Sequence, residues 1–176
     1  MSVTANYVRI NEDALEALRG DDQWMEAIYG GRVPSAHVLS VDKACNGIIW
    51  LLSRMPLPSA TPVVGIGFVV RRSLAPLLSG AGGMKELHME APYGPPSVLT
   101  HRQVNEMSDW LGGVDFDQLR TLYDPQAMHA AGIYPDIWID EGPAAFDEYL
   151  LPHLRHLRDF FAEAATAEQN VVVFFT

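Results

Sequence analysis

Hydrophobic side chains recur at intervals of three and four residues in three segments, and this spacing predicts three amphipathic helices. The clearest segment covers residues 41–52, follows Ser40 as an N-cap, and carries one fully apolar face. A second helix follows Thr100, which opens a capping box with a glutamine three residues later. The third and longest covers residues 143–164 and contains Pro152, which should kink it because proline lacks the N–H of the helical hydrogen bond.

Apolar runs without helical spacing predict strands. Residues 7–10 favour an extended conformation near the amino-terminal end, and residues 87–89 fit a short strand before a turn-rich segment. Residues 62–70 form an apolar run bounded by a proline and two arginines, which indicates a buried strand. Residues 171–175 include no charged side chain and are apolar at every position, so we expect a central strand there.

Shorter helices are predicted where a capping side chain precedes a few apolar positions. Asn11 is suited to cap a helix that carries Leu15 and Leu18. Asp21 or Asp22 caps the next helix. Two further helices have the same signal, an aspartate at the N-cap: Asp115 and Asp124.

These elements predict an α+β fold in a single domain that covers residues 1–176. A mixed or antiparallel sheet packs against several helices, and a long kinked C-terminal helix is followed by a final strand. The length of 176 residues and the hydrophobic fraction of 48% are sufficient for one well-filled core. No repeat, low-complexity tract or linker divides the sequence.

The net charge restricts the classes of partner. The chain has 22 acidic and 12 basic side chains, which gives a formal net charge of −10. Because such a surface repels phosphate groups, we expect neither nucleic acid nor a membrane surface as a partner. The candidate partner is another protein, although net acidity is also a common means of keeping a protein in solution. The oligomeric state stays open.

Cysteine use and hydropathy favour a cytoplasmic location. Cys45 is the only cysteine, so the chain contains no intrachain disulfide. Residues 1–10 lack a basic region followed by an apolar run, so we expect no secretory signal there. The apolar stretches are far shorter than the roughly 20 residues that cross a bilayer.

Signatures of cofactor, metal and nucleophile sites are incomplete. Gly65 and Gly67 match part of a dinucleotide-binding turn, but the strand pattern continues past them, so we expect no cofactor. His153 and His156 could share a metal ion, but no third ligand has a matching spacing, so no metal site is predicted. Cys45 lies on an apolar helix face and is predicted to be a core residue.

Two proline-containing segments present aromatic side chains. Residues 92–96 place Tyr93 in a stiff turn, and residues 133–140, predicted to be irregular, carry Tyr134 and Trp138. Rigid aromatic side chains suit a recognition surface, because they bury a large area at a small cost in entropy. They suit the filling of a core equally well, so both interpretations stay open.

Short motifs spread over nearly the whole chain carry a family resemblance. They are Asn6-Tyr7-x-Arg9, Val41-Asp42-Lys43-Ala44, Gly47-Ile48, Tyr93-Gly94-Pro95, Tyr123-Asp124-Pro125-x-x-Met128 and Ile133-Tyr134-Pro135-Asp136-Ile137-Trp138. In these motifs the chain resembles the YfbM family, a bacterial family of unknown function. The resemblance implies a small single-domain α+β fold with no known cofactor and no established reaction.

One motif departs from that family. In the family that the chain resembles, the Asp-Lys-Ala motif found here at residues 42–44 is followed by tryptophan, histidine and glycine, with a further histidine shortly afterwards. This chain has Cys45, Asn46 and Gly47 there, and Trp50 beyond them. A mechanism that depends on those histidines is therefore in doubt for this chain, or the helix face is a variable binding surface.

The sequence supports two functional hypotheses. The first is a small non-catalytic binding module, of which one version is an acidic protein that neutralises a basic partner such as a toxin. The second is an enzyme of unassigned reaction whose polar pocket is built from the two aromatic loops. Its candidate residues, with Asp42 and Asn46 facing the others across a cleft, are Tyr93, Tyr134, Asp136, Trp138, His129, Asp42 and Asn46.

Overall fold

A five-stranded antiparallel sheet forms the centre of the fold. Its strand order is β2-β1-β5-β4-β3, and each hydrogen-bonded pair is antiparallel. The computed structural model describes residues 3–19, 21–31, 38–55, 85–87 and 89–176. The strands are β1 (Ala5–Ile10), β2 (Val38–Ser40), β3 (Lys85–Glu86), β4 (Ser97–Leu99) and β5 (Asn170–Phe175). The predicted α+β class is confirmed, and the sheet is antiparallel.

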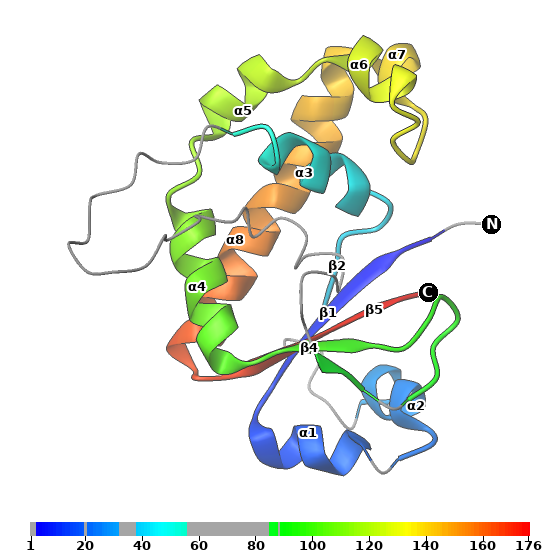
Figure 1. The fold of residues 1–176 in the computed structure, drawn as a ribbon, viewed down its shortest axis with the longest axis vertical. Coiled ribbons are helices and arrows are strands. Elements are labelled where there is room, and N and C mark those ends of the chain that lie inside the picture. Colours follow the sequence, from blue (N-terminus) through cyan, green and yellow to red (C-terminus); the bar gives the residue numbers. More distant parts are fainter. Residues whose placement is uncertain (1–2, 20, 32–37, 56–84, 88) are drawn as a thin grey trace, which may run out of the picture.

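Helices cover both faces of this sheet (Figure 1). Two short helices, α1 and α2, lie on one face, and the larger helical layer lies on the other. The helices are α1 (Glu12–Arg19), α2 (Trp24–Tyr29), α3 (Cys45–Leu52), α4 (His101–Gly112), α5 (Phe116–Leu122), α6 (Pro125–Ala130), α7 (Trp138–Glu141), the π-helix η3 (Ala145–Leu150) and α8 (Leu151–Thr166). The long carboxyl-terminal helix followed by a final strand is therefore confirmed.

Strand β5 is central and is buried on both faces, as its unbroken apolar sequence predicts. Val171 and Val173 belong to the larger core under α4 and α8, whereas Val172 and Phe174 belong to the smaller core under α1 and α2. Successive side chains of a strand point to opposite faces, so this one strand holds both cores together.

The predicted capping residues are confirmed at four helices. The Asn11 side chain accepts a hydrogen bond from the Ala14 N–H at 2.9 Å at the start of α1. Thr100 and Gln103 form the complete capping box of α4. The other two are the aspartates that cap α5 and α6, Asp115 and Asp124. At α2 the N-cap is Gln23, and Asp21 instead accepts from the Gln23 N–H at 2.8 Å.

The predicted start of the helix at residues 41–52 was wrong. Ser40 is the last residue of β2 and pairs with Asn6 of β1, so it does not cap a helix. Asp42 then has a positive φ of 48°, and α3 begins only at Cys45. The pairing of β2 with β1 is a contact between distant segments, and a local helical pattern does not reveal it.

Three other segments also differ from the sequence-based expectation. The segment 133–140 is not irregular throughout, because α7 begins at Trp138. The short strand expected at residues 87–89 lies earlier in the chain, because β3 ends at Glu86. The helix expected to kink at Pro152 is divided into η3 and α8, and Pro152 lies in the first turn of α8, where its missing N–H is tolerated. The predicted strand at residues 62–70, with Gly65 and Gly67, lies outside the described residues.

Candidate functional site

The two aromatic loops do not contribute jointly to the cavity that the structure describes. Tyr93 lies in the loop between β3 and β4, and its side chain is 40% exposed. Tyr134 lies between α6 and α7. The cavity takes Gly94 and Pro95 from the first loop, and no residue from the second lines it.

Trp138 fills the larger core. Its side chain is fully buried, and its indole N–H donates to the Ile133 carbonyl at 2.6 Å. The ring packs so closely on α3 that a Cβ atom added to Gly47 would lie 2.7 Å from it. A side chain so placed holds the loop to the helix and does not face a ligand.

His129 and Asp136 form a surface pair. The His129 Nδ1 lies 2.7 Å from the Asp136 Oδ1, and the two side chains are 51% and 59% exposed. Exposed pairs of this kind contribute little stability. Asn46 is exposed on α3, and no hydrogen bond joins it to this pair within the described residues.

Two of the sequence-predicted residues, Asp42 and Tyr134, neighbour Tyr149 in the structure. Tyr149 and the adjoining His153 were not among the candidate site residues. Tyr149 donates its hydroxyl hydrogen to the Asp42 Oδ2 at 3.1 Å. The ring of His153 packs edge-on against Tyr149 with the centroids 5.3 Å apart. We call these four residues, Asp42, Tyr134, Tyr149 and His153, the Asp42 cluster.

The titration behaviour of this cluster follows from its burial. Burial raises the pKa of Tyr149, and the neighbouring Asp42 carboxylate and Tyr134 raise it further, so the phenol stays protonated. Burial lowers the pKa of His153; Asp42 acts in the opposite direction, and His156 lowers the pKa further. The Nδ1 of His153 is buried with no hydrogen-bond partner in the described residues, which disfavours the second proton that a charged imidazole carries.

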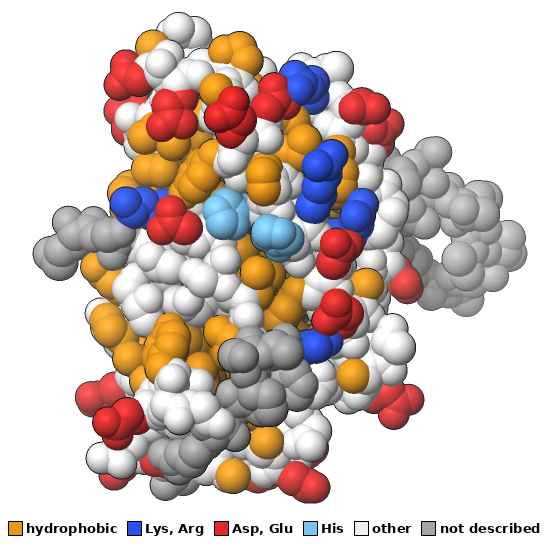
Figure 2. Space-filling model, turned by 180° about the vertical axis from the view of Figure 1, so that it is seen from behind, with side chains coloured by type: hydrophobic (Ala, Val, Ile, Leu, Met, Phe, Trp, Pro, Cys, Tyr) orange, Lys and Arg blue, Asp and Glu red, His pale blue; other side chains and the backbone are white. Residues whose placement is uncertain are grey.

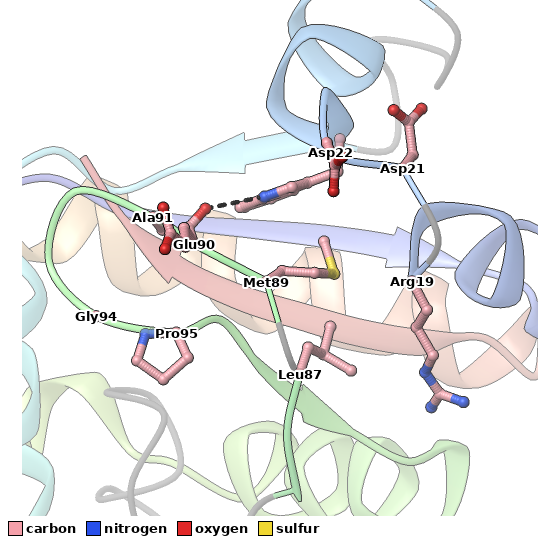
Figure 3. A pocket seen from close by; sticks show the side chains of 10 residues that line it. Arg19, Asp21, Asp22, Leu87, Met89, Glu90, Ala91, Gly94 and Pro95 are labelled. Atoms are coloured by element: carbon pink, nitrogen blue, oxygen red, sulfur yellow. Dashed lines mark hydrogen bonds between the residues drawn. The ribbon is translucent and has the colours of Figure 1, made fainter.

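A cavity of about 870 Å³ lies on the opposite side of the sheet, between the α1–α2 segment and the chain that joins β3 to β4 (Figure 3). We call it the acidic groove. Three carboxylates line it, together with an apolar floor and a rim of small residues. Its residues are Arg19, Asp21, Asp22, Trp24, Leu87, Met89, Glu90, Ala91, Gly94 and Pro95.

The floor of the groove is fixed by a tryptophan. The indole N–H of Trp24 donates to the Glu90 carbonyl at 3.0 Å, the dashed line in Figure 3. The Trp24 ring also stands edge-on against Phe174 of β5, with the centroids 5.0 Å apart. The side chains of Leu87 and Met89 lie between Arg19 at one end and Pro95 at the other. The groove is therefore anchored to the central strand.

The charge of the groove is negative. Arg19 lines it, but its guanidinium pairs with Glu16 on the preceding turn of α1. Within the described segments, Asp22 and Glu90 form no ion pair, and both side chains are exposed. The groove thus offers carboxylate oxygens above an apolar floor.

Sequence reasoning missed the groove because its residues come from two distant segments. Asp21 and Asp22 gave a signal, but only as capping residues. Met89 and Glu90 directly precede the loop at residues 92–96 that the aromatic pattern selected. The sequence therefore pointed to this loop but not to the groove residues beside it. No local motif relates the acidic pair at 21–22 to the residues at 89–90.

Neither a metal cluster nor a membrane-spanning helix is found in the part of the chain that the structure describes. No three histidine, cysteine, aspartate or glutamate side chains there are placed to hold a metal ion. None of the helices described combines the length and apolar composition that crossing a bilayer requires.

A sequence profile described as a domain of unknown function, DUF1877, matches residues 1–174. The chain belongs to this family. The crystal structure of YfbM from Escherichia coli, itself titled a protein of unknown function, has a TM-score of 0.64 to this DUF1877 chain at 15% identity. The match covers 98% of this chain and 99% of that one. At this identity it shows a shared fold alone, and no curated protein matches the sequence.

The resemblance to the YfbM family is therefore confirmed, and with it the small single-domain α+β fold. Neither the DUF1877 family nor this relative brings an assigned function.

Proposed function

We propose that this DUF1877 chain is a binding module that takes a basic side chain of a partner protein into the acidic groove. The observation that supports this is the combination of exposed Asp22 and Glu90 carboxylates with a floor of Leu87 and Met89. Lysine and arginine combine an apolar stem with a charged head, so they match both parts of such a surface.

The charge of the whole chain supports the same class of partner. A net charge of −10 attracts basic proteins at long range and increases their rate of association. The groove adds a specific location at which a basic side chain is held. The proposal thus develops the hypothesis of a non-catalytic module with a protein partner.

The test is a binding titration with a fluorescently labelled peptide of alternating lysine and leucine, followed by anisotropy. The double variant Asp22→Asn/Glu90→Gln keeps the shape of both side chains and removes both charges. We expect its affinity to fall by about tenfold or more, because hydrogen bonds to charged groups contribute about 1.5–3 kcal/mol each.

A matched control separates the groove from the net charge. The variant Glu106→Gln/Asp140→Asn removes two exposed carboxylates from α4 and α7, outside the groove. We expect it to change the affinity by no more than about twofold, as isolated surface charges do. Equal losses in the two variants, or an absence of saturable binding in the unmodified chain, would overturn the proposal.

Two further parts of the functional picture stay predictions. The enzyme hypothesis, with a pocket shared by the Tyr93 and Tyr134 loops, needs a reaction that removing either hydroxyl abolishes. A cytoplasmic location is supported by Cys45, the only cysteine, which is a buried free thiol.

A further inference from the structure

The Asp42 carboxylate is held in place by its neighbours. Asp42 has a positive φ of 48°, a conformation that aspartate and asparagine adopt more readily than most residues. One of its oxygens, Oδ2, accepts from the Tyr149 hydroxyl at 3.1 Å. The second oxygen, Oδ1, has no hydrogen bond to any described residue, and the side chain is exposed.

The tyrosine of the cluster lies in a π-helix, and the histidine lies in the α-helix that follows it. Tyr149 lies in the π-helix η3, which is followed directly by α8. Single π-turns within helices occur frequently at functional sites, because they change which side chains share a face. The rings of Tyr149 and His153, which are four residues apart in the sequence, meet at an interplanar angle of 89°.

Histidine side chains adjoin near the middle of one face of the molecule, next to acidic and hydrophobic side chains (Figure 2). His153 is half-buried, and its Nδ1 is among the buried atoms without a partner in the described chain. A neutral imidazole there leaves the Asp42 charge uncompensated on this side. The half-buried Tyr134 adds a second phenol ring near Tyr149.

We propose that the Asp42 cluster is a second binding site, which takes a small organic ammonium group and releases it when His153 gains a proton. The Asp42 Oδ1 supplies the acceptor and the opposite charge, and the phenol rings of Tyr134 and Tyr149 supply surfaces that attract cations. An anion would meet the carboxylate instead, and a metal ion would lack its ligands, because no three metal-binding side chains converge in the described residues.

The charged groups around His153 define the sign of the pH dependence. Asp42 acts on it from the turn after β2, Tyr149 packs against it from η3, and His156 acts on it from α8 itself. A bound cation disfavours a second positive charge, so binding lowers the pKa of His153 further. By linkage, the affinity is complete above the ordinary histidine pKa of 6.5 and falls as pH drops through the lowered value.

The probes are methylammonium and tetramethylammonium ions, with neutral tert-butanol as a control of similar shape. Binding is followed through the imidazole C–H resonances of the folded chain by nuclear magnetic resonance, with each addition repeated above pH 6.5 and below the lowered pKa of His153. We expect saturable shifts of the His153 resonances with an ammonium probe above pH 6.5, and no such shifts with tert-butanol.

Four variants test the assignment. Asp42→Asn keeps the left-handed backbone accessible and removes the charge, so the affinity should fall by about tenfold or more. Tyr149→Phe keeps the ring and frees the carboxylate, so the loss should be smaller. His153→Gln, in which binding is followed through the resonances of the ammonium probe itself, should bind the ion at both pH values, because the competing proton is gone. The groove variant Asp22→Asn/Glu90→Gln should bind it as the unmodified chain does, which separates this site from the proposed function.

The proposal is overturned if tert-butanol shifts the His153 resonances as much as the ammonium ions do. It is also overturned if Asp42→Asn, with an unchanged circular dichroism spectrum, binds equally well. Retention of the full pH dependence in His153→Gln would show that another group controls the release.

Discussion

Cys45 and Tyr7 show how burial determines chemistry at a single residue. The thiol sulfur lies 3.5 Å from the Tyr7 hydroxyl, and both side chains belong to the larger core. Burial raises the pKa of the Cys45 thiol to about 11, although the Tyr7 hydrogen bond acts in the opposite direction. Burial, followed by Cys45 itself, raises the pKa of Tyr7. Both groups therefore stay neutral at ordinary pH.

We expect Cys45 to be inert toward thiol reagents in the folded chain. A pKa shift from 9.0 to about 11 lowers the thiolate fraction at pH 8 by about 100-fold, and steric exclusion adds to this. Reaction with Ellman's reagent at pH 8, in native buffer and in denaturant, measures the ratio. Rapid native reaction would contradict the burial of this helix face.

The same shift makes stability decrease in alkaline solution. In the unfolded chain the thiol loses its proton near pH 9.0, whereas in the folded chain it keeps the proton to about pH 11. The unfolded state therefore binds fewer protons between these values, and the free energy of unfolding falls as the pH rises through this window.

At the scale of the element, Gly47 illustrates a close approach between two helices. It lies inside α3, and an added Cβ would be 2.7 Å from the Trp138 ring and 3.0 Å from Leu150. Alanine usually stabilises a helix interior by about 1 kcal/mol relative to glycine. Here we expect alanine to be destabilising instead, because its methyl group would clash with a fully buried ring and a buried leucine.

We therefore expect Gly47→Ala to reduce the free energy of unfolding by about 1–3 kcal/mol, as overpacked cores do. Urea unfolding measures this change in free energy, and Gly112→Ala is the matched control. Gly112 ends α4 with nothing within 4 Å of its added Cβ, so that variant should be as stable as the unmodified chain or slightly more so. A stabilised Gly47→Ala would show that Trp138 moves easily.

Element boundaries were predictable where the signal is local. The caps Asn11, Thr100, Asp115 and Asp124 act on N–H groups two or three residues away, so the sequence alone identifies them. Ser40 misled because its partner is Asn6 of a distant strand. The acidic groove and the Asp42 cluster escaped prediction for the same reason, since each joins segments that only the tertiary fold brings together.

At the scale of the whole molecule, the two proposed sites lie on different helical layers that share one sheet. The acidic groove is built on α1, α2 and the chain after β3, over the smaller core. The Asp42 cluster is built on η3, α8 and the turn before α3, over the larger one. Strand β5 contributes alternate side chains to both cores. The stability of the groove is therefore coupled to that of the helical layer.

This coupling predicts a single cooperative unfolding transition. Leu15→Ala shortens a side chain of α1 in the smaller core, and Leu157→Ala shortens a side chain of α8 in the larger core. Both leucines are fully or almost fully buried. Each should cost about 2–5 kcal/mol. In urea, far-ultraviolet circular dichroism and binding of the lysine–leucine peptide should be lost together in both variants, because Val172 and Phe174 cannot leave the smaller core while Val171 and Val173 stay paired in the sheet. Loss of peptide binding in Leu15→Ala well before the loss of helix signal would instead show that the α1–α2 layer unfolds by itself, and that the groove is held only by local contacts.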